Sequence, residues 1–182
     1  MDFTNYPNIA AIAEELGGIK TTMFNKKLTE AAERSWEQFT PEELERINEE
    51  AASAEKIGCS YIMPTAILRM GRNEHALLAI PVRDIVWIYG SVTTTRLNFI
   101  FPMYKEHEVR IVTRDRATHT VFQKTTAAFT RKKPADDTIA QIRVIIDFYR
   151  KGIFYGWSKE MQKLACENFA YMIETADAQS NG

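Results

Sequence analysis

The chain has 182 residues, of which 45% are apolar and 26% are charged, and this balance favours a globular domain with a core over a disordered chain. The net charge is −1, yet residues 1–60 hold 6 Lys/Arg against 12 Asp/Glu, whereas residues 61–150 hold 14 against 8. The N-terminus lacks the pattern of a secretory signal and the longest apolar runs are too short to span a bilayer, so we expect a cytoplasmic protein.

Residues 1–57 are expected to form a helical N-terminal extension, because apolar residues recur at helical spacing as far as Trp36 and beyond. The clearest local pattern begins at Thr40, which suits the N-cap of a helix. Pro41 fits the first helical position, and Glu43 completes a capping box. The helix that follows carries many glutamates, so its exposed side is expected to be an anionic surface.

Between residues 58 and 123 the pattern changes from helical to extended. Seven short apolar runs, separated by turn residues and with no helix between them, predict antiparallel strands. The predicted strands are 59–63, 66–70, 75–80, 84–89, 97–104, 109–113 and 118–123. The turn Arg114-Asp115-Arg116-Ala117 is expected to join the last two.

Beyond Pro134 the helical period returns, and Gly152 ends the predicted helix. An aromatic connector, Phe154-Tyr155-Gly156-Trp157, precedes Ser158, which is expected to cap a last amphipathic helix. These elements divide the chain into three parts. The parts are the helical extension at 1–57, a strand-rich domain with its helix at 58–152, and a C-terminal amphipathic helix at 153–182.

Seven short antiparallel strands followed by one amphipathic helix resemble the layout of a pleckstrin-homology-like (PH-like) domain. The run Ile80-Pro81-Val82-Arg83-Asp84-Ile85 resembles a phrase common in bacterial members, and the stretch from Tyr61 to Ile153, with the helix start Gly156-Trp157-Ser158-Lys159-Glu160, looks like a group of bacterial proteins with such a domain. The resemblance implies an α+β fold, namely a seven-stranded antiparallel bent barrel or sandwich capped by a helix, with helices added at both ends.

Lipid-binding members of the pleckstrin-homology family usually carry a basic cluster in the loop between the first two strands. Here that loop is little more than Pro64-Thr65, with no Lys or Arg. The usual inositol-phosphate site is therefore not expected in this chain.

The basic part of the chain supplies a first candidate surface, formed by Arg114, Arg116, Arg131, Lys132 and Lys133. It could meet anionic lipid, nucleic acid, or an acidic protein surface such as this chain's own helices or those of a second copy. The alternative is a solvated strand edge that charge protects from aggregation. Nucleic acid is not expected, because the pI of 6.3 is not basic and no nucleic-acid reader motif occurs.

The aromatic connector is the second candidate, through Tyr155 and Trp157. Such a cluster is either a hydrophobic hinge packed on the domain or an anchor for a partner, since Trp and Tyr dominate interface hot spots. The sequence leaves both interpretations open.

No motif points to a catalytic, metal or cofactor-binding site, and no cofactor or small-molecule substrate is inferred. His75, His107 and His119 fit no metal-ligand spacing, so we expect surface histidines. Cys59 and Cys166 are expected to be buried free thiols, because they show neither metal-ligand spacing nor an export signal.

Three functions remain open. The first is a non-catalytic protein-interaction module whose partner is another protein or a second copy, and the opposite charges of residues 1–60 and 61–150 favour it. The second is peripheral binding to an anionic membrane surface through the basic candidates. The third is an enzyme with no recognisable motif.

Overall fold

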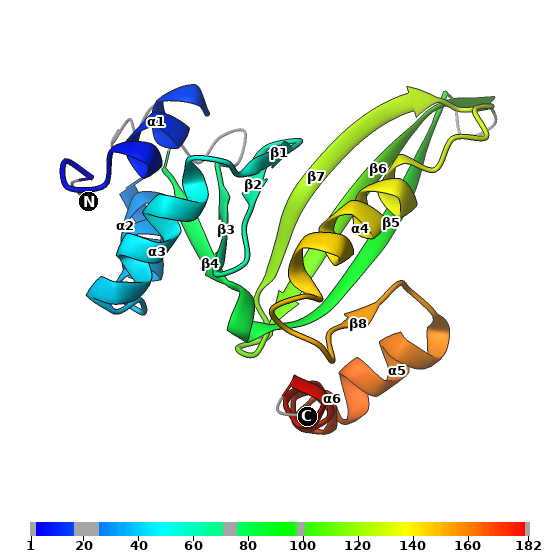
Figure 1. The fold of residues 1–182 in the computed structure, drawn as a ribbon. Helices are drawn as coiled ribbons and strands as arrows, with labels where there is room; N and C mark the ends of the chain where they lie inside the picture. Colours follow the sequence, from blue (N-terminus) through cyan, green and yellow to red (C-terminus); the bar gives the residue numbers. More distant parts are fainter. Residues whose placement is uncertain (1–2, 17–25, 71–75, 98–100, 181–182) are drawn as a thin grey trace. The chain divides into compact units, whose positions relative to one another are not determined.

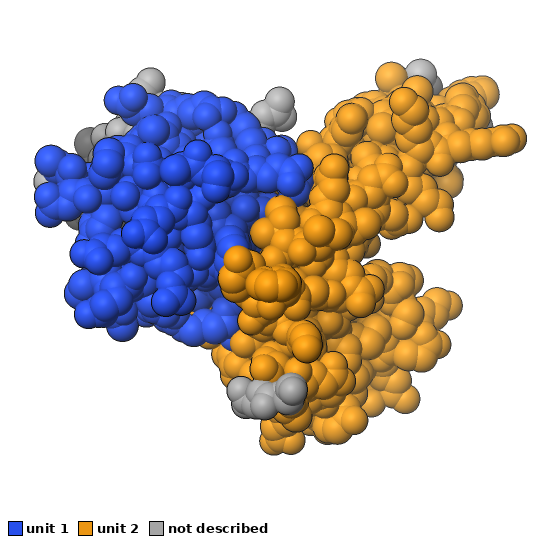
Figure 2. All heavy atoms as spheres, in the orientation of Figure 1, with its two compact units in different colours: residues 1–83 blue, residues 84–182 orange. Residues whose placement is uncertain are grey.

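The structure is a computed structural model that describes residues 3–16, 26–70, 76–97 and 101–180 (Figure 1). Within these residues the chain forms six α-helices and two four-stranded sheets whose strand pairs are mostly antiparallel. The chain divides into two compact units, residues 1–83 and 84–182 (Figure 2). The predicted α+β class is confirmed.

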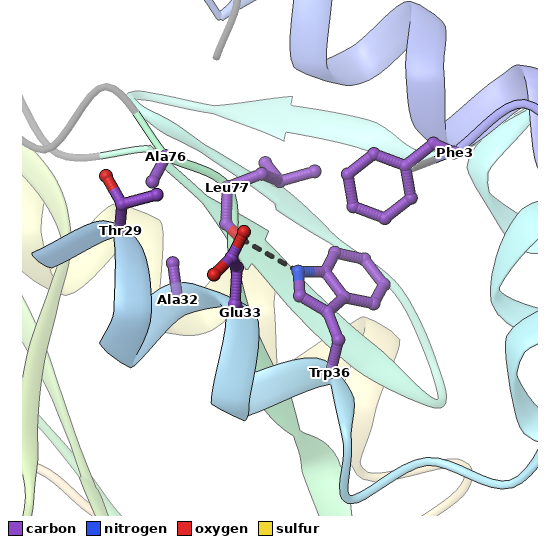
Figure 3. A pocket seen from close by; sticks show the side chains of 7 residues that line it. All are labelled: Phe3, Thr29, Ala32, Glu33, Trp36, Ala76 and Leu77. Carbon is purple, nitrogen blue, oxygen red and sulfur yellow. Dashed lines mark hydrogen bonds between the residues drawn. The ribbon is translucent and has the colours of Figure 1, made fainter. Parts of the chain in front are cut away.

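The first unit combines three helices with a sheet whose strand order β1-β2-β3-β4 follows the chain. Its elements are α1 (Pro7–Glu15), α2 (Lys26–Trp36), α3 (Pro41–Ala51), β1 (Glu55–Ile57), β2 (Ser60–Ile62), β3 (Ala66–Arg69) and β4 (Leu78–Pro81). The indole of Trp36 lies at the centre of its core (Figure 3). Trp36 Nε1 donates a hydrogen bond of 2.8 Å to the carbonyl oxygen of Leu77, and the ring of Phe3 meets the indole edge-on with centroids 4.8 Å apart. Helix α2 is thereby fixed to the residue before β4, and Ala79 N of β4 donates to Ser35 Oγ at 3.0 Å.

A small hollow beside Trp36 has a volume of about 10 Å³. Thr29, Ala32 and Glu33 of α2 line one side of it (Figure 3). This volume is at the lower limit for a single water molecule. The hollow is therefore a packing gap of the first unit and is too small to hold a ligand.

Helix α3 begins with the capping box that the sequence predicts. Glu43 N donates to Thr40 Oγ1 at 3.2 Å, and Thr40 N donates to Glu43 Oε2 at 2.9 Å. Helix α1 has no capping side chain of its own, because its N-cap residue is Tyr6. Instead Asn48 of α3 accepts from Asn8 N at 2.9 Å through its side-chain oxygen. In return Asn8 Nδ2 donates to the carbonyl oxygen of Asn48 at 2.8 Å, so each helix binds a backbone group of the other.

The second unit is built on a sheet of two long strands and two shorter ones, in the order β7-β6-β5-β8. Its elements are β5 (Ile85–Leu97), β6 (Phe101–Thr113), β7 (Thr118–Ala127), α4 (Pro134–Ile146), β8 (Phe154–Tyr155), α5 (Lys159–Glu167) and α6 (Phe169–Ser180); a short 3₁₀ turn, Val82–Asp84, precedes β5. Strand β8 runs parallel to β5, with Trp87 opposite Phe154.

The two faces of this sheet are covered by different helices. On one face α4 buries Ile142 and Ile146, and a Cβ added at Gly90 would lie 3.2 Å from Ala135 Cβ, so glycine permits this close approach. The other face near the start of β5 is covered by α5 and α6, where Trp87 packs in a cluster with Phe169. The sheet is therefore covered by α4 on one face and, near the start of β5, by α5 and α6 on the other.

Several sequence expectations need correction. Seven strands precede α4, but they are divided between two open four-stranded sheets, and no closed barrel is found among the described residues. The predicted strands at 97–104 and 109–113 are largely one strand, β6, whose polar stretch Lys105–Glu108 gave no apolar pattern. Part of the first of these predictions, residues 98–100, lies outside the described residues, and so does the start of the strand predicted at 75–80.

The predicted C-terminal amphipathic helix is divided at Asn168 into α5 and α6, because Asn168 has the non-helical angles φ −147° and ψ 62°. Ser158 does cap α5, accepting a hydrogen bond of 3.1 Å from Met161 N. The domain boundaries expected at 57/58 and 152/153 stay predictions. The division of the chain into two compact units falls at 83/84.

Candidate functional site

A pocket of about 240 Å³ lies in the second unit between the sheet and helices α5 and α6. Its aromatic lining comes from two residues of β5, one residue just before α5 and one residue of α6, namely Trp87, Tyr89, Trp157 and Phe169. Its polar lining comes from Arg116, Thr118 and Gln162, and Cys166 of α5 also contributes. Two residues predicted from the sequence as interaction candidates, Arg116 and Trp157, therefore belong to one site.

The floor of the pocket is a pair of stacked rings on β5. Trp87 and Tyr89 lie two residues apart, so they face the same side of the strand. Their centroids are 4.3 Å apart and their planes differ by 29°. Trp87 Nε1 donates to the carbonyl oxygen of Gly156 at 2.6 Å, and Gly156 N donates to the carbonyl oxygen of Ile88 at 2.9 Å. These bonds fix the indole in its orientation.

Arg116 reaches the pocket from the turn between β6 and β7. Its backbone has φ 65°, and its N–H donates to the carbonyl oxygen of Thr113 at 2.8 Å. Its guanidinium carbon lies 5.2 Å from the centroid of the Phe169 ring, which is a cation–π distance. No carboxylate partner of Arg116 is found in the described part of the chain.

Trp157 and Cys166 form the exposed side of the pocket. Trp157 is 51% exposed, although it is the largest apolar side chain of the aromatic connector. Cys166 is exposed and Cys59 is half-buried, and both are free thiols. The expectation of two buried thiols was wrong for Cys166, because α5 buries none of its residues and exposes this side.

Arg114 has a different, structural position. It donates to both carboxylate oxygens of Asp177 on α6, at 2.8 Å from Nη1 to Oδ2 and through a second, shorter contact from Nη2 to Oδ1. Its Nε lies 3.5 Å from Asp84 Oδ1. Arg150, which is 8% exposed, donates from Nη2 to Asp177 Oδ1 at 3.2 Å. The arginine pair holds the pKa of Asp177 below its ordinary value, chiefly through the hydrogen bond from Arg114.

Tyr155 is also held inside the unit. Its hydroxyl donates to Asp147 Oδ1 at 2.7 Å, and the guanidinium carbon of Arg143 lies 4.9 Å from its ring centroid. Burial raises the pKa of Tyr155, and the hydrogen bond to Asp147 adds to the rise. The side chain therefore fastens β8 to the end of α4.

The remaining basic candidates, Arg131, Lys132 and Lys133, are exposed on the connection between β7 and α4. Lys133 Nζ lies 3.6 Å from Asp136 Oδ2 at the helix start. Phe129, two residues before Arg131, is 85% exposed. Phe129 was not predicted as a candidate, although an aromatic residue two positions before a basic run is a signal for one.

An exposed acidic face lies on α3 in the first unit. Glu42, Glu45 and Glu49 recur at a spacing of three and four residues, so they share one side of the helix. All three are exposed, and no ion pair of theirs is found in the described residues. Glu43 and Glu50 differ, because Glu43 binds Arg83 and Glu50 Oε1 accepts from Thr65 Oγ1 at 2.7 Å.

The histidines do not share one environment. His107 is only 3% exposed, so the expected surface position was wrong for this residue. It lies on the same side of β6 as the buried Val109 and Ile111, and its Nε2 is 3.0 Å from Thr126 Oγ1. Burial lowers the pKa of His107. His119 is half-buried, and His75 lies outside the described residues.

Comparison with protein-family models, with curated proteins and with solved structures gives no match. In the described part of the chain no group of three or more His, Cys, Asp or Glu side chains is placed to hold a metal ion. None of the described helices combines the length and the apolar composition needed to cross a membrane.

Proposed function

We propose that this chain is a non-catalytic interaction module that binds a second copy of itself through complementary charge. The acidic side would be the α3 face, formed by Glu42, Glu45 and Glu49. The basic side would be the β7–α4 connection, formed by Arg131, Lys132 and Lys133. The observation that supports the proposal is that all six side chains are exposed, whereas Arg114 and Glu43 are bound within the chain. Lys133 also lies 3.6 Å from Asp136, and both of these side chains remain largely exposed.

Ion pairs within the chain exclude some of the charged residues that the sequence suggested for the interaction surface. Arg114 forms ion pairs with Asp177 and Asp84, so we do not expect its guanidinium to bind a partner. Glu43 is likewise engaged by Arg83. An interface between exposed charges depends on ionic strength, since the Debye length falls from about 10 Å at 0.1 M salt to about 3 Å at 1 M.

Sedimentation velocity at low and at high salt tests this function. We expect a dimer or larger assembly at low salt that dissociates as salt is added. Reversal of Arg131, Lys132 and Lys133 to Glu should abolish the assembly and leave the unfolding transition unchanged. A monomer at every salt and protein concentration would contradict the proposal.

Peripheral binding to an anionic membrane is the second candidate, and the exposure of Phe129 favours it. An exposed aromatic ring beside basic residues suits the membrane interface, where rings lie at headgroup level and each Lys or Arg adds about 1 kcal/mol of attraction. The loop Pro64-Thr65 does not contribute, because Thr65 is bound to the carboxylate of Glu50.

Co-sedimentation with phosphatidylserine and phosphatidylcholine vesicles separates the two candidates. Membrane binding predicts that Phe129→Ser weakens sedimentation with the anionic vesicles, whereas self-association predicts no effect of Phe129→Ser on the assembly. Equal recovery with both kinds of vesicle would rule out the membrane function.

At the level of the fold, we also propose that β1–β7 with α4 form a PH-like domain. The supporting observation is the order of elements, since four strands of one sheet and three of another precede the helix. An experimental structure in which the two sheets do not pack face to face would contradict this assignment.

A further inference from the structure

We infer that the pocket beside Trp157 is a binding site for a small aromatic carboxylate, with Arg116 as the counter-charge. The ligand would lie between the aromatic side chains and direct its acid group to the guanidinium. None of the residues on which the proposed self-association rests lines this pocket, so the two proposals can fail independently.

The volume of the pocket sets the size of the ligand. At about 240 Å³ it is smaller than the sites of drug-sized molecules, which measure about 300–1,000 Å³. It is larger than an apolar cavity of about 150 Å³ that accepts benzene. One aromatic ring or two fused rings with a short acid group would therefore fill it.

The walls favour a flat, aromatic occupant. Trp87 and Tyr89 are stacked and the Trp87 indole is fixed by Gly156, so the floor is a rigid aromatic surface before any ligand arrives. Trp157 is half-exposed at the edge of the pocket, where an incoming ring would cover it. Aromatic rings gain from offset or edge-to-face contact in addition to the burial of their surface.

The charge of the pocket selects an acid. Arg110 and Arg114, the preceding arginines of the β6–β7 hairpin, are paired with Glu108 and with Asp177. Arg116 differs from both, since the described residues supply it with a ring contact and no carboxylate. The side chains of Thr118 and Gln162 add hydrogen-bond donors to the lining, and the described structure shows no hydrogen bond of either side chain. A guanidinium in this position matches the two oxygens of a carboxylate.

The backbone of Arg116 is a second, independent observation. Its φ of 65° lies in the left-handed region, which glycine adopts most easily and which is uncommon for other residue types. The fold alone would favour glycine in this turn. A binding role explains why a long cationic side chain occupies the position instead.

The left-handed backbone also supplies the best variant. Arg116→Gly removes the guanidinium while it relieves the backbone, so the protein should fold at least as well as the wild type. Arg116→Lys is the matched conservative change, since it keeps the positive charge and loses the two-pronged geometry. Cys166 lines the pocket and is exposed, whereas Cys59 lies in the other unit and serves as an internal control for thiol modification.

The test is calorimetric titration of the full chain with 2-naphthoate, with 2-naphthamide and cyclohexanecarboxylate as the uncharged and non-aromatic controls. We expect saturable one-to-one binding of 2-naphthoate and at least about tenfold weaker binding of both controls. Arg116→Gly should bind 2-naphthoate at least about tenfold more weakly than the wild type, with an unchanged or higher unfolding midpoint. The affinity of Arg116→Lys should lie between those of the wild type and Arg116→Gly.

Modification of the thiols by a colourless disulfide reagent gives a separate readout. Saturating 2-naphthoate should slow the reaction of Cys166 and leave the rate of Cys59 unchanged. The inference is overturned if none of the probes binds, if 2-naphthoate and its amide bind equally, or if Arg116→Gly binds as the wild type does. Equal slowing of both thiols would also overturn it, because such an effect is not located at the pocket.

Discussion

The ionic cluster of Arg114, Arg150 and Asp177 is expected to hold α6 on the second unit, and Asp177→Asn tests this role. The substitution keeps the size of the side chain and removes its negative charge. Arg150, which is 8% exposed, would then lie beside Arg114 with no carboxylate at Asp177 to balance the two cations. Burial already lowers the pKa of Arg150, and the charge of Arg114 adds to this effect.

The expected loss of unfolding free energy is about 2 kcal/mol. Breaking a fully buried ion pair costs about 3–5 kcal/mol, whereas an exposed pair is worth about 0–1 kcal/mol. Asp177 lies between these limits, because its side chain is 36% exposed and it binds one buried and one half-buried arginine.

The difference in unfolding free energy between wild type and Asp177→Asn should also decrease at low pH. The pKa of Asp177 is lowered in the folded state, so its contribution is present above the ordinary value of 3.8 and is lost as the pH falls through the folded value. Wild type and Asp177→Asn should therefore become more alike in stability as the pH falls below about 3.8.

Urea unfolding, followed by tryptophan fluorescence and circular dichroism, measures both effects. Glu174→Gln is the matched control, since Glu174 is an exposed acid on the same helix with no described ion pair, and it should change stability by less than about 0.5 kcal/mol. Equal stability of Asp177→Asn and wild type at neutral pH would refute the role assigned to the cluster.

Three further changes have expected outcomes. Thr40→Ala should lower the unfolding free energy by about 1 kcal/mol in urea titrations, since it removes the capping box of α3; an unchanged midpoint would contradict this. Gly152→Ala should cost more than about 2 kcal/mol in the same assay, because φ is 87° and the new Cβ would lie 2.4 Å from the carbonyl oxygen of Ala176; a stable variant would show that α6 is loosely held. The pKa of His107 is lowered by burial, so its neutral form stabilises the fold above the ordinary value of 6.5 and this stability is lost as the pH falls. In His107→Gln the pH dependence between about 7 and 5 should flatten, and an unaltered slope would disprove the assignment.

Two helix caps and one turn could be predicted from the sequence, because each forms between residues that are close together in the chain. The capping box at Thr40, the cap at Ser158 and the turn Arg114–Ala117 depend on neighbours within four residues, so their side chains identify them. The full length of β6 could not be predicted, because the side chains from Lys105 to Glu108 are mostly polar and only His107 among them is buried. Strand β8 has two residues and is recognisable only by its pairing with β5.

The candidate site was predicted in part for the same reason. Trp157 and Arg116 were candidates from the sequence, but the sequence left open whether Trp157 is packed or exposed. Trp87 and Phe169 carry no pattern that separates them from ordinary core residues. The pairing of β8 with β5 brings Trp157 close to Trp87, although they are far apart in the chain. Arg114 was assigned to a surface because its partner Asp177 lies 63 residues away.

The most direct test of the proposed self-association is a mixture of two charge-reversed variants. One carries Glu in place of Arg131, Lys132 and Lys133, and the other carries Lys in place of Glu42, Glu45 and Glu49. Each variant alone presents like charges on both faces, so sedimentation velocity at low salt should show monomers. In the mixture, the acidic faces of one variant meet the basic faces of the other. The two variants should therefore form a heterodimer that dissociates at high salt. If the mixture stays monomeric while the wild type associates, the two faces do not bind each other and the proposal is wrong.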